Sequence, residues 1–180
     1  MKKAAVLGSP IAHSCSPQLH LAAYRALDLS DWTYERIECG ADELPGVVGG
    51  FGPEWVGVSV TMPGKFAALR FADERTDRAE LVGSANTLLR TSRGWRADNT
   101  DIDGVLGALG TASGRAVVSG SGGTAPAAIV ALAELGVAIS PWWHATRTRP
   151  PGWWNWRLGS APRPAFATWT ATPGGLLPTR

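Results

Sequence analysis

The 180-residue sequence contains only two cysteines and three lysines, and it has no long hydrophobic run. Cys15 and Cys39 form no CxxC pair, and two cysteines are too few for a disulfide framework, so we expect free thiols in a reducing compartment. No segment approaches the roughly 18 apolar residues of a membrane span, and the N-terminal stretch is too short in apolar residues for a signal peptide. These absences favour a soluble cytoplasmic protein without a membrane partner.

Acidic residues are missing from the last part of the chain. The net charge of the whole sequence is +2, which gives no global field that would favour nucleic acid as a partner. The charge is unevenly distributed, with −3 in residues 1–140 and +5 in residues 141–180. Residues 141–180 also hold six of the nine tryptophans and seven of the thirteen prolines. This segment differs in composition from everything before it.

Strand and helix patterns alternate along residues 1–110, which predicts an α/β domain. The expected strands are 4–8, 32–39 and 56–61, with a hairpin of 85–91 and 94–99, and the expected helices are 16–29, 41–50, 64–72 and 101–109. Ser16 is the expected N-cap of the first helix, followed by Pro17 as its first helical residue. A small polar linker, 111–115, precedes a strand, a glycine-rich turn, a helix and a second strand in 116–139, which is the beginning of a nucleotide-binding βαβ unit.

A glycine-rich loop, GSGGTA, lies between the first strand and the helix of that unit. Glycines in this position allow the backbone to approach a pyrophosphate, whose charge the N-terminus of the helix favours. Alanine in place of the last glycine is tolerated by the pattern. The alternative is a glycine turn that binds nothing. The candidate cofactor-binding residues are Gly120, Ser121, Gly122, Gly123, Thr124 and Ala125.

Two hydroxyl side chains, Ser14 and Ser16, flank Cys15 just before the first helix. In an extended segment they face the same side, near the free N–H groups of the helix start, which suits a carboxylate ligand. The alternative is that Ser16 only caps the helix and Ser14 has no role. Cys15 itself is expected to be incidental.

Lys65 follows a buried strand that ends at Thr61 and a Pro-Gly turn. Only three lysines occur beside fourteen arginines, and an ammonium group, unlike a guanidinium, is readily tuned for proton transfer by its surroundings. A solvated surface lysine is the alternative interpretation.

Further polar motifs are GSANT (83–87) and DNTDIDG (98–104). Asn86 offers a donor and an acceptor, and Asp101 stands at a predicted helix start, where it or Thr100 could simply cap the helix. Asp98, Asp101 and Asp103 do not have the spacing of a calcium-binding loop, so no metal site is expected.

These motifs, in this order, strongly resemble the shikimate dehydrogenase family. The resemblance extends from about residue 5 to residue 139, three quarters of the chain. It implies an N-terminal α/β substrate-binding domain (1–110), followed by the start of a Rossmann-type domain that binds NADP (111–140). It implies reversible NADPH-dependent reduction of 3-dehydroshikimate to shikimate in aromatic amino acid biosynthesis.

The resemblance also implies roles for single residues. Ser14 and Ser16 would hold the substrate carboxylate. Thr61, Asn86 and Asp101 would hold the ring hydroxyls. Lys65 and Asp101 would form the catalytic pair, with Lys65 also contacting the substrate. Quinate is an alternative substrate, because the residues around Ser14 and Ser16 do not discriminate it from shikimate. Oligomeric state is not predicted.

The resemblance ends at the second strand of the βαβ unit. The family has an Asn-Arg and a further basic residue there for the 2′-phosphate of NADP, whereas this chain continues with Ser140, Pro141 and two tryptophans. Arg147 and Arg149 have the wrong offset for this role. We therefore expect an incomplete Rossmann domain, and a non-catalytic shikimate-binding fragment is the alternative function.

The composition of residues 141–180 suggests translation in a wrong frame of G+C-rich DNA. Reading the gene in the other two frames near codon 140 tests this hypothesis. An authentic tail that binds an anionic membrane or a single-stranded nucleic acid is an alternative, although the tail lacks the periodicity of a membrane helix. We expect this segment to be disordered or poorly packed.

Overall fold

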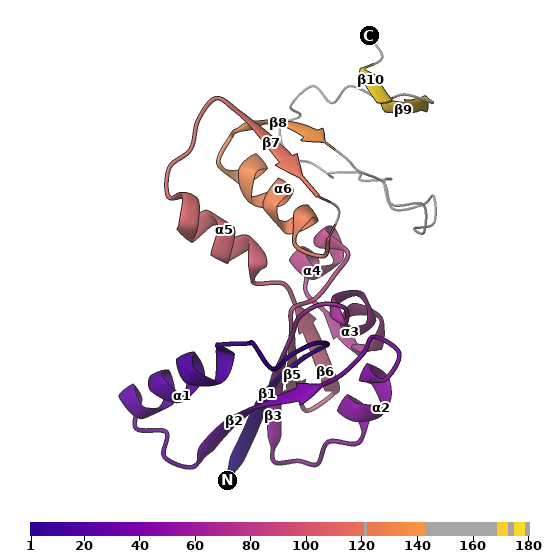
Figure 1. The fold of residues 1–180 in the computed structure, drawn as a ribbon. Coiled ribbons are helices and arrows are strands. Elements are labelled where there is room, and N and C mark those ends of the chain that lie inside the picture. The colour runs from indigo at the N-terminus through magenta and orange to yellow at the C-terminus, as the bar shows by residue number, and fades with distance from the viewer. Residues whose placement is uncertain (121, 143–168, 173–174, 179–180) are drawn as a thin grey trace. The chain divides into compact units, whose positions relative to one another are not determined.

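The computed structural model describes residues 1–120, 122–142, 169–172 and 175–178 (Figure 1). Contacts divide the chain into two compact units, Met1–Arg147 and Thr148–Arg180. The strands are β1 Lys2–Gly8, β2 Trp32–Glu38, β3 Trp55–Val60, β4 Glu74–Arg75, β5 Thr87–Thr91, β6 Gly94–Asp98, β7 Arg115–Ser119, β8 Ala138–Trp142, β9 Trp169–Thr172 and β10 Gly175–Pro178. The helices are α1 Ser16–Ala26, α2 Leu44–Gly49, α3 Lys65–Phe71, α4 Asp77–Val82, α5 Asp101–Leu109 and α6 Ala125–Glu134.

A six-stranded mixed sheet forms the centre of the first unit, in the order β2-β1-β3-β5-β6-β4. Strand β1 is parallel to β2 and to β3, while β5 is antiparallel to β3 and forms a hairpin with β6. Because β6 therefore runs in the same direction as β3, strands β1, β2, β3 and β6 all end at one edge, which we call the carboxyl edge. The predicted α/β class and the predicted hairpin are confirmed.

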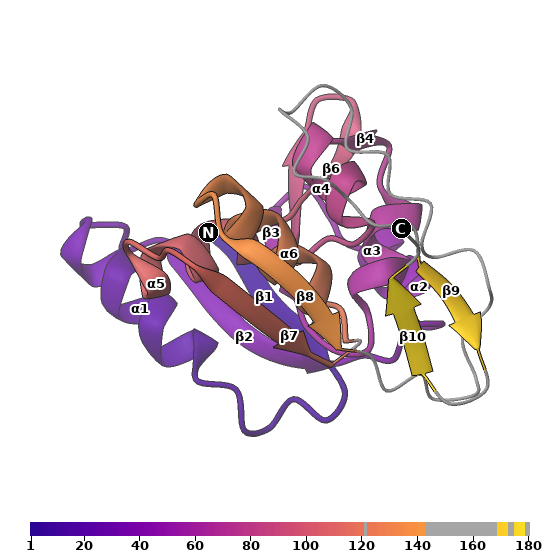
Figure 2. The ribbon, with the colours of Figure 1, turned by 90° about the horizontal axis from the view of Figure 1, so that it is seen from above.

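The side chains of β1 alternate between two hydrophobic layers, as expected for a strand that is buried on both faces. Ala4 and Val6 pack with Tyr34 and with residues of α1, whereas Ala5 and Leu7 belong to the larger core with residues of α2 and α3. Accordingly α1 lies on one face of the sheet and α2 and α3 lie on the other (Figures 1 and 2).

Strands β7 and β8 pair in parallel with α6 between them in the chain, so the predicted strand–glycine turn–helix–strand unit is present (Figure 2). Helix α6 packs against α5 and α4 through a small cluster that includes Ile102, Ala127 and Val130. On β7, by contrast, the side chain of Val117 is 67% exposed.

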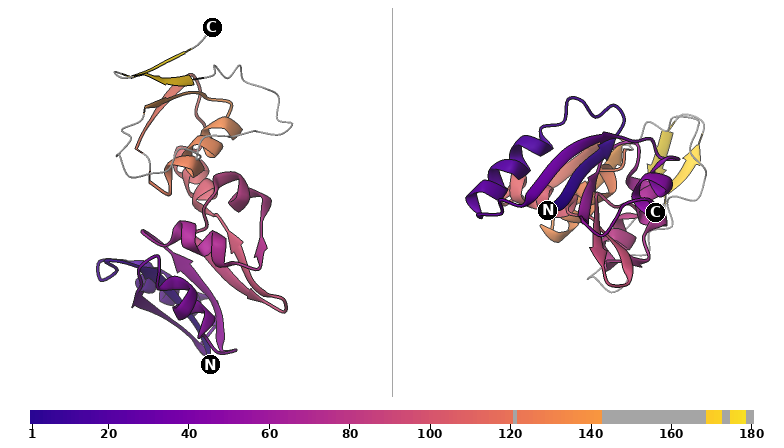
Figure 3. Two further views of the ribbon diagram at one scale, coloured as in Figure 1. Left: turned by 90° about the vertical axis from the view of Figure 1, so that its right-hand side faces the viewer. Right: turned by 90° about the horizontal axis from the view of Figure 1, so that it is seen from below.

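The structure differs from the expected elements in two places. Helix α1 has Cys15 rather than Ser16 as its N-cap, because Ser16 is already the first residue of the helix. The Ser16 hydroxyl accepts a hydrogen bond from the Ser14 hydroxyl instead. Strand β4 and helix α4, which connect α3 to β5, were not expected from the sequence (labelled in Figure 2; Figure 3 gives two further views). Thr76 caps α4 with its side chain, and Gly83 ends the helix with a φ of +73°.

The predicted tail, residues 141–180, lies largely outside the described residues. Within it, the structure describes the end of β8 and an antiparallel pair formed by β9 and β10. The hypothesis of a wrong reading frame and the expected disorder therefore concern residues of which little is described. None of the helices in the described part of the chain has the length and hydrophobicity of a membrane-spanning segment.

Candidate functional site

The carboxyl edge of the sheet gathers the residues that the sequence motifs single out. Ser14 lies in the connection after β1 and Ser16 begins α1. Thr61 directly follows β3, Asn86 directly precedes β5, and Asp101 follows β6. Ligand sites of α/β sheets form at this edge, because the chain leaves each parallel strand there and its loops converge.

Lys65 and Asp101 form a close ion pair. The Nζ atom of Lys65, in the first turn of α3, donates to Oδ2 of Asp101, in the first turn of α5, at 2.5 Å. Their side chains are 13% and 19% exposed, so both are sheltered and still reachable. The fold thus brings the charged groups of these two residues into contact, although they are 36 positions apart in the sequence.

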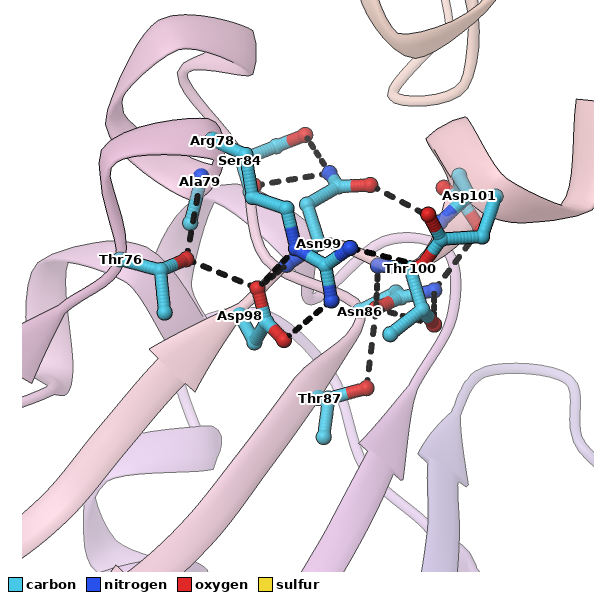
Figure 4. Close-up of polar contacts among 11 residues, drawn as sticks. Thr76, Arg78, Ala79, Ser84, Asn86, Thr87, Asp98, Asn99, Thr100 and Asp101 are labelled. Carbon is cyan, nitrogen blue, oxygen red and sulfur yellow. Dashed lines mark hydrogen bonds and ion pairs between the residues drawn. The ribbon is translucent and has the colours of Figure 1, made fainter. Parts of the chain in front are cut away.

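Asn86 fixes the other oxygen of Asp101. Its Nδ2 donates to Oδ1 of Asp101 at 2.9 Å and to Oγ1 of Thr100 at 2.9 Å, while its Oδ1 accepts from the backbone N–H of Thr100 at 3.0 Å. Figure 4 shows Asn86 beside Asp101 and Thr100. Both carboxylate oxygens of Asp101 are therefore bonded, one by the ammonium of Lys65 and one by the amide of Asn86. This leaves little rotational freedom for the carboxylate.

The two serines lie with their hydroxyls together. Ser14 Oγ donates to Ser16 Oγ at 3.1 Å and accepts from the Ser16 backbone N–H at 3.3 Å. Both side chains are half-buried. Two adjacent hydroxyls beside the start of an 11-residue helix can donate to the oxygens of one carboxylate.

The loop that carries the serines is held by two charged residues of β2. Arg36 donates from Nε and Nη2 to the backbone carbonyl of Ser14, at 2.8 and 2.5 Å. Glu38 accepts from the Ser9 hydroxyl at 2.6 Å and from the backbone N–H of Ile11 at 3.0 Å. These two hydrogen bonds lower the pKa of Glu38. The sequence analysis missed both residues, since a strand pattern does not reveal contacts with a loop more than twenty positions away.

Thr61 is fixed by its backbone and by a close neighbour. Its N–H donates to the carbonyl of Leu7 at 2.8 Å, which ties the end of β3 to β1. A Cβ atom on Gly8 would lie 2.4 Å from Cγ2 of Thr61, so the glycine makes room for the threonine side chain. The half-buried Thr61 side chain thus occupies space that any larger residue at position 8 would take.

An arginine clamps the turn that presents Asp101. Arg78 of α4 donates from Nε and Nη2 to the two carboxylate oxygens of Asp98, both at 2.6 Å (Figure 4). It also donates from Nη1 to Asp103 at 2.6 Å. Asp98 ends β6 and Asp103 lies in α5, so the guanidinium spans the connection that contains Asp101. Chiefly because of the hydrogen bonds from Arg78, the pKa of Asp98 falls to about 2. All three aspartates of this motif are therefore bonded by side chains of the protein. Arg78 binds Asp98 and Asp103, while Lys65 and Asn86 bind Asp101.

The low pKa of Asp98 predicts a pH-dependent contribution to stability. A carboxyl group whose pKa is lower in the folded state stabilises the fold above its unfolded pKa, near 3.8, and this contribution disappears as pH falls through about 2. Replacing Asp98 by asparagine should lower the free energy of unfolding by roughly 1 to 2 kcal/mol at neutral pH, after allowance for partial exposure, and by almost nothing near pH 2.

Urea unfolding of the two proteins across this pH range measures the difference. Asp103→Asn is the matched control, because Asp103 binds the same arginine but its side chain is 59% exposed, so its ion pair should contribute at most about 0.5 kcal/mol. A difference between wild type and Asp98→Asn that stays constant from neutral to acidic pH would contradict this prediction.

The glycine-rich loop connects β7 to α6. Gly120 has a φ of +125°, a backbone conformation that favours glycine, and a Cβ atom at Gly120 or Gly122 would meet no atom within 4 Å. The backbone of these two glycines is therefore open to a ligand, at the N-terminus of the 10-residue helix that begins at Ala125. Ser121 lies outside the described residues, as do most residues after β8, where a 2′-phosphate would be recognised.

The loop also contacts the ion pair. The hydroxyl of Thr124 accepts a hydrogen bond from Nζ of Lys65 at 3.1 Å, and a Cβ atom on Gly123 would lie 3.2 Å from Cδ of Lys65. The sequence analysis assigned Thr124 to the cofactor alone. In the part of the chain that the structure describes, no group of three or more His, Cys, Asp or Glu side chains is arranged to hold a metal ion.

Comparisons with known sequences identify relatives of the chain. The family model described as the shikimate dehydrogenase substrate binding domain matches residues 6–88. A shikimate dehydrogenase (NADP(+)) from Roseobacter denitrificans is 42% identical over 156 residues, which cover 81% of this chain and 56% of the relative. One from Microcystis aeruginosa is 38% identical over 137 residues, which cover 73% and 48%. The chain thus spans about half the length of the curated relatives it matches.

Comparison with solved structures identifies shikimate dehydrogenases with a similar fold. The crystal structure of Mycobacterium tuberculosis shikimate dehydrogenase is 81% identical, with a TM-score of 0.75, and the match covers 79% of this chain and 56% of that one. A shikimate 5-dehydrogenase from Thermus thermophilus, in complex with NADP(H) and shikimate, is 34% identical with a TM-score of 0.70 and the same coverage.

Proposed function

Because the chain belongs to the shikimate dehydrogenase family, we propose that it carries the substrate-binding and acid–base half of an NADP-dependent shikimate dehydrogenase. The observation that carries this proposal is the contact between Lys65 and Asp101. The two side chains are largely buried, and they lie at the same edge of the sheet as the serine pair. The reaction is the reversible oxidation of shikimate to 3-dehydroshikimate, a step towards the aromatic amino acids.

The substrate is proposed to bind along the carboxyl edge. The hydroxyls of Ser14 and Ser16 donate hydrogen bonds to the carboxylate of shikimate. The hydrogen bond between the two serines is given up when the ligand binds. Thr61, Asn86 and Asp101 bind the ring hydroxyls. The free carboxylate lone pairs of Asp101 and the three donors of the Lys65 ammonium make both residues able to bond a hydroxyl while they remain paired.

Lys65 is proposed as the acid–base group. Oxidation of a secondary alcohol removes a hydride from carbon and a proton from oxygen, and NADP accepts the hydride when it is bound. For oxidation, Lys65 first releases one ammonium proton to solvent, and the neutral amine then takes the proton from the substrate oxygen; in the reverse direction the ammonium gives a proton to the forming hydroxyl. Asp101 holds Nζ in position and stabilises the ammonium that results, since its Oδ2 already accepts from that atom.

The glycine-rich loop is proposed to hold the pyrophosphate of NADP. Its support is the open backbone of Gly120 and Gly122 and the adjacent start of α6, while Gly123, Thr124 and Ala125 complete the turn. The described residues do not include a basic side chain that could select the 2′-phosphate after β8. We propose NADP rather than NAD on the basis of the relatives. A cytoplasmic location is proposed as well, and the two free cysteines are in keeping with it.

Titration of the chain with shikimate, followed by NADP⁺ and then by both together, tests this function. Calorimetry measures each affinity, and the absorbance of reduced nicotinamide measures turnover. Binding of shikimate with turnover supports the proposal, whereas binding without turnover would make the chain a non-catalytic shikimate-binding fragment. Failure to bind shikimate, or a clear preference for quinate, would contradict it.

The serine pair offers a sharper version of this titration. Ser14→Ala combined with Ser16→Ala should weaken shikimate binding by about a hundredfold, because two hydrogen bonds to a charged group are lost. Ser92→Ala is the matched control, since Ser92 is exposed in the hairpin turn at the other end of the strands. The affinity of this variant for shikimate should equal that of wild type.

A further inference from the structure

The glycine-rich loop is linked to Lys65 by a direct contact. Thr124 Oγ1 accepts from Lys65 Nζ at 3.1 Å, the same atom that donates to Asp101. The aliphatic stem of Lys65 lies against Gly123, where even a methyl group would approach Cδ to 3.2 Å. The lysine therefore has one hydrogen bond to its acidic partner and one to the loop.

The same loop is linked to Asp101 through two buried side chains. The Ser84 hydroxyl donates to the carbonyl of Gly123 at 3.2 Å. The Asn99 amide donates to the Ser84 carbonyl at 2.9 Å and to the Ser84 hydroxyl at 3.3 Å, and its Oδ1 accepts from the backbone N–H of Asp101 at 3.1 Å. Figure 4 shows the Asn99 side chain between Ser84 and Asp101.

Burial makes this second link stiff. Ser84 and Asn99 are both 0% exposed, and they are the polar residues among the buried ones that the structure describes. A buried amide or hydroxyl that loses its partner has no water to replace it, so each hydrogen bond resists breaking. The buried hydrogen bonds therefore form a continuous connection from the Gly123 carbonyl to the first turn of α5.

Both members of the ion pair are thus attached to one loop by separate routes. We infer that Ser84 and Thr124 are positioning residues, through which the glycine-rich loop aligns Asp101 and Lys65 with each other. The catalytic importance of this alignment rests on the proposed function, whereas the hydrogen bonds that link the loop to the ion pair are independent of it. Correct alignment of an acid–base group contributes to the rate of the chemical step more than to substrate affinity.

Ser84→Ala and Thr124→Val separate the two routes. Ser84→Ala removes the bond to Gly123 but leaves the stronger bond of Asn99 to the Ser84 backbone carbonyl, so the fold should survive. Thr124→Val removes the acceptor for Lys65 and keeps the shape of an exposed side chain. Thr124→Ser restores the hydroxyl and is the rescue variant.

Amide hydrogen exchange of the unliganded chain, measured by NMR, tests the link through Ser84. The Ala125 N–H donates to the carbonyl of Gly122, which neighbours Gly123. Ser84→Ala should speed exchange of the Asp101 N–H and of the Ala125 N–H together, each by about tenfold, the equivalent of one hydrogen bond. Thr124→Val, which cuts only a side-chain contact, should leave the Asp101 N–H within about twofold of wild type. Unchanged exchange at Asp101 in Ser84→Ala would overturn the inference.

Steady-state kinetics tests the consequence for the ion pair. Ser84→Ala and Thr124→Val should each lower kcat for shikimate oxidation by about tenfold, with KM and the calorimetric affinity for shikimate within about threefold of wild type. Thr124→Ser should restore kcat. Equal losses in affinity and rate, or no recovery in Thr124→Ser, would reduce these residues to a structural role.

The proposed function and the positioning role of Ser84 and Thr124 are contradicted by different results. A wild-type chain that neither binds nor oxidises shikimate contradicts the proposed function, and the exchange measurement still decides whether the loop is linked to Asp101. A wild-type chain that is active, with variants that match it in kcat and in exchange, contradicts the positioning role alone.

Discussion

Replacing Lys65 by alanine should lower kcat for shikimate oxidation by about 10²- to 10⁴-fold, the range expected when a general acid–base group is removed. Nζ of Lys65 is held by Asp101 and Thr124, so its loss removes the proposed acid–base group without removing any residue of the serine pair. Shikimate affinity, measured by calorimetry, should therefore fall far less than kcat, which identifies an interaction made mainly in the transition state.

Lys2→Ala provides the control for this experiment. Lys2 is one of three lysines and is exposed at the start of β1, where its ammonium lies 5.2 Å from the ring centre of Trp32. Its replacement should leave kcat within about twofold of wild type, because it lies at the opposite end of β1 from the carboxyl edge. A large loss of affinity with unchanged kcat in Lys65→Ala would instead make Lys65 a binding residue only.

Replacing Leu88 by alanine should lower the free energy of unfolding by about 2 to 5 kcal/mol. Leu88 is 0% exposed in the centre of the main core, and β5 pairs with β3 on one side and β6 on the other, so the neighbouring backbone is poorly able to close the cavity. Urea unfolding followed by circular dichroism measures the change, and the slope with urea should stay constant.

The neighbouring residue is a matched control. Leu89 is in the same strand but points to the opposite face and is 41% exposed, so Leu89→Ala should cost less than about 1 kcal/mol. Equal losses for the two variants would mean that the hairpin does not dock on β3 as described. Retained stability in Leu88→Ala would place the core elsewhere.

The family and the α/β class could be predicted from the sequence because they depend on local patterns. Short buried strands, a proline at the start of α1 and glycines between β7 and α6 each act within a few residues of their position. Their order along the chain carried the resemblance that the comparisons confirm over residues 6–88. The proposed site residues belong to these motifs, and their roles stay predictions.

Long-range polar contacts could not be predicted in this way. The pairing of Arg78 with Asp98 and the bond from Ser84 to Gly123 join residues 20 and 39 positions apart. A single arginine or serine carries no mark of its partner, so a sequence pattern treats both as surface residues. Helix α4 was a different failure, because Thr76 before an acidic turn and Gly83 after it are recognisable boundary signals that the sequence analysis overlooked.

The two ends of the β5–β6 hairpin carry different kinds of residue. Asn86 and Asp98 lie at its open end on the carboxyl edge, whereas its turn, Ser92 and Arg93, is exposed at the far end of both strands. A fluorescent dye attached by a cysteine at position 92 would sit a full strand length from the chemistry. That turn is therefore the natural place to immobilise or tag the protein for single-molecule work while the ion pair stays untouched.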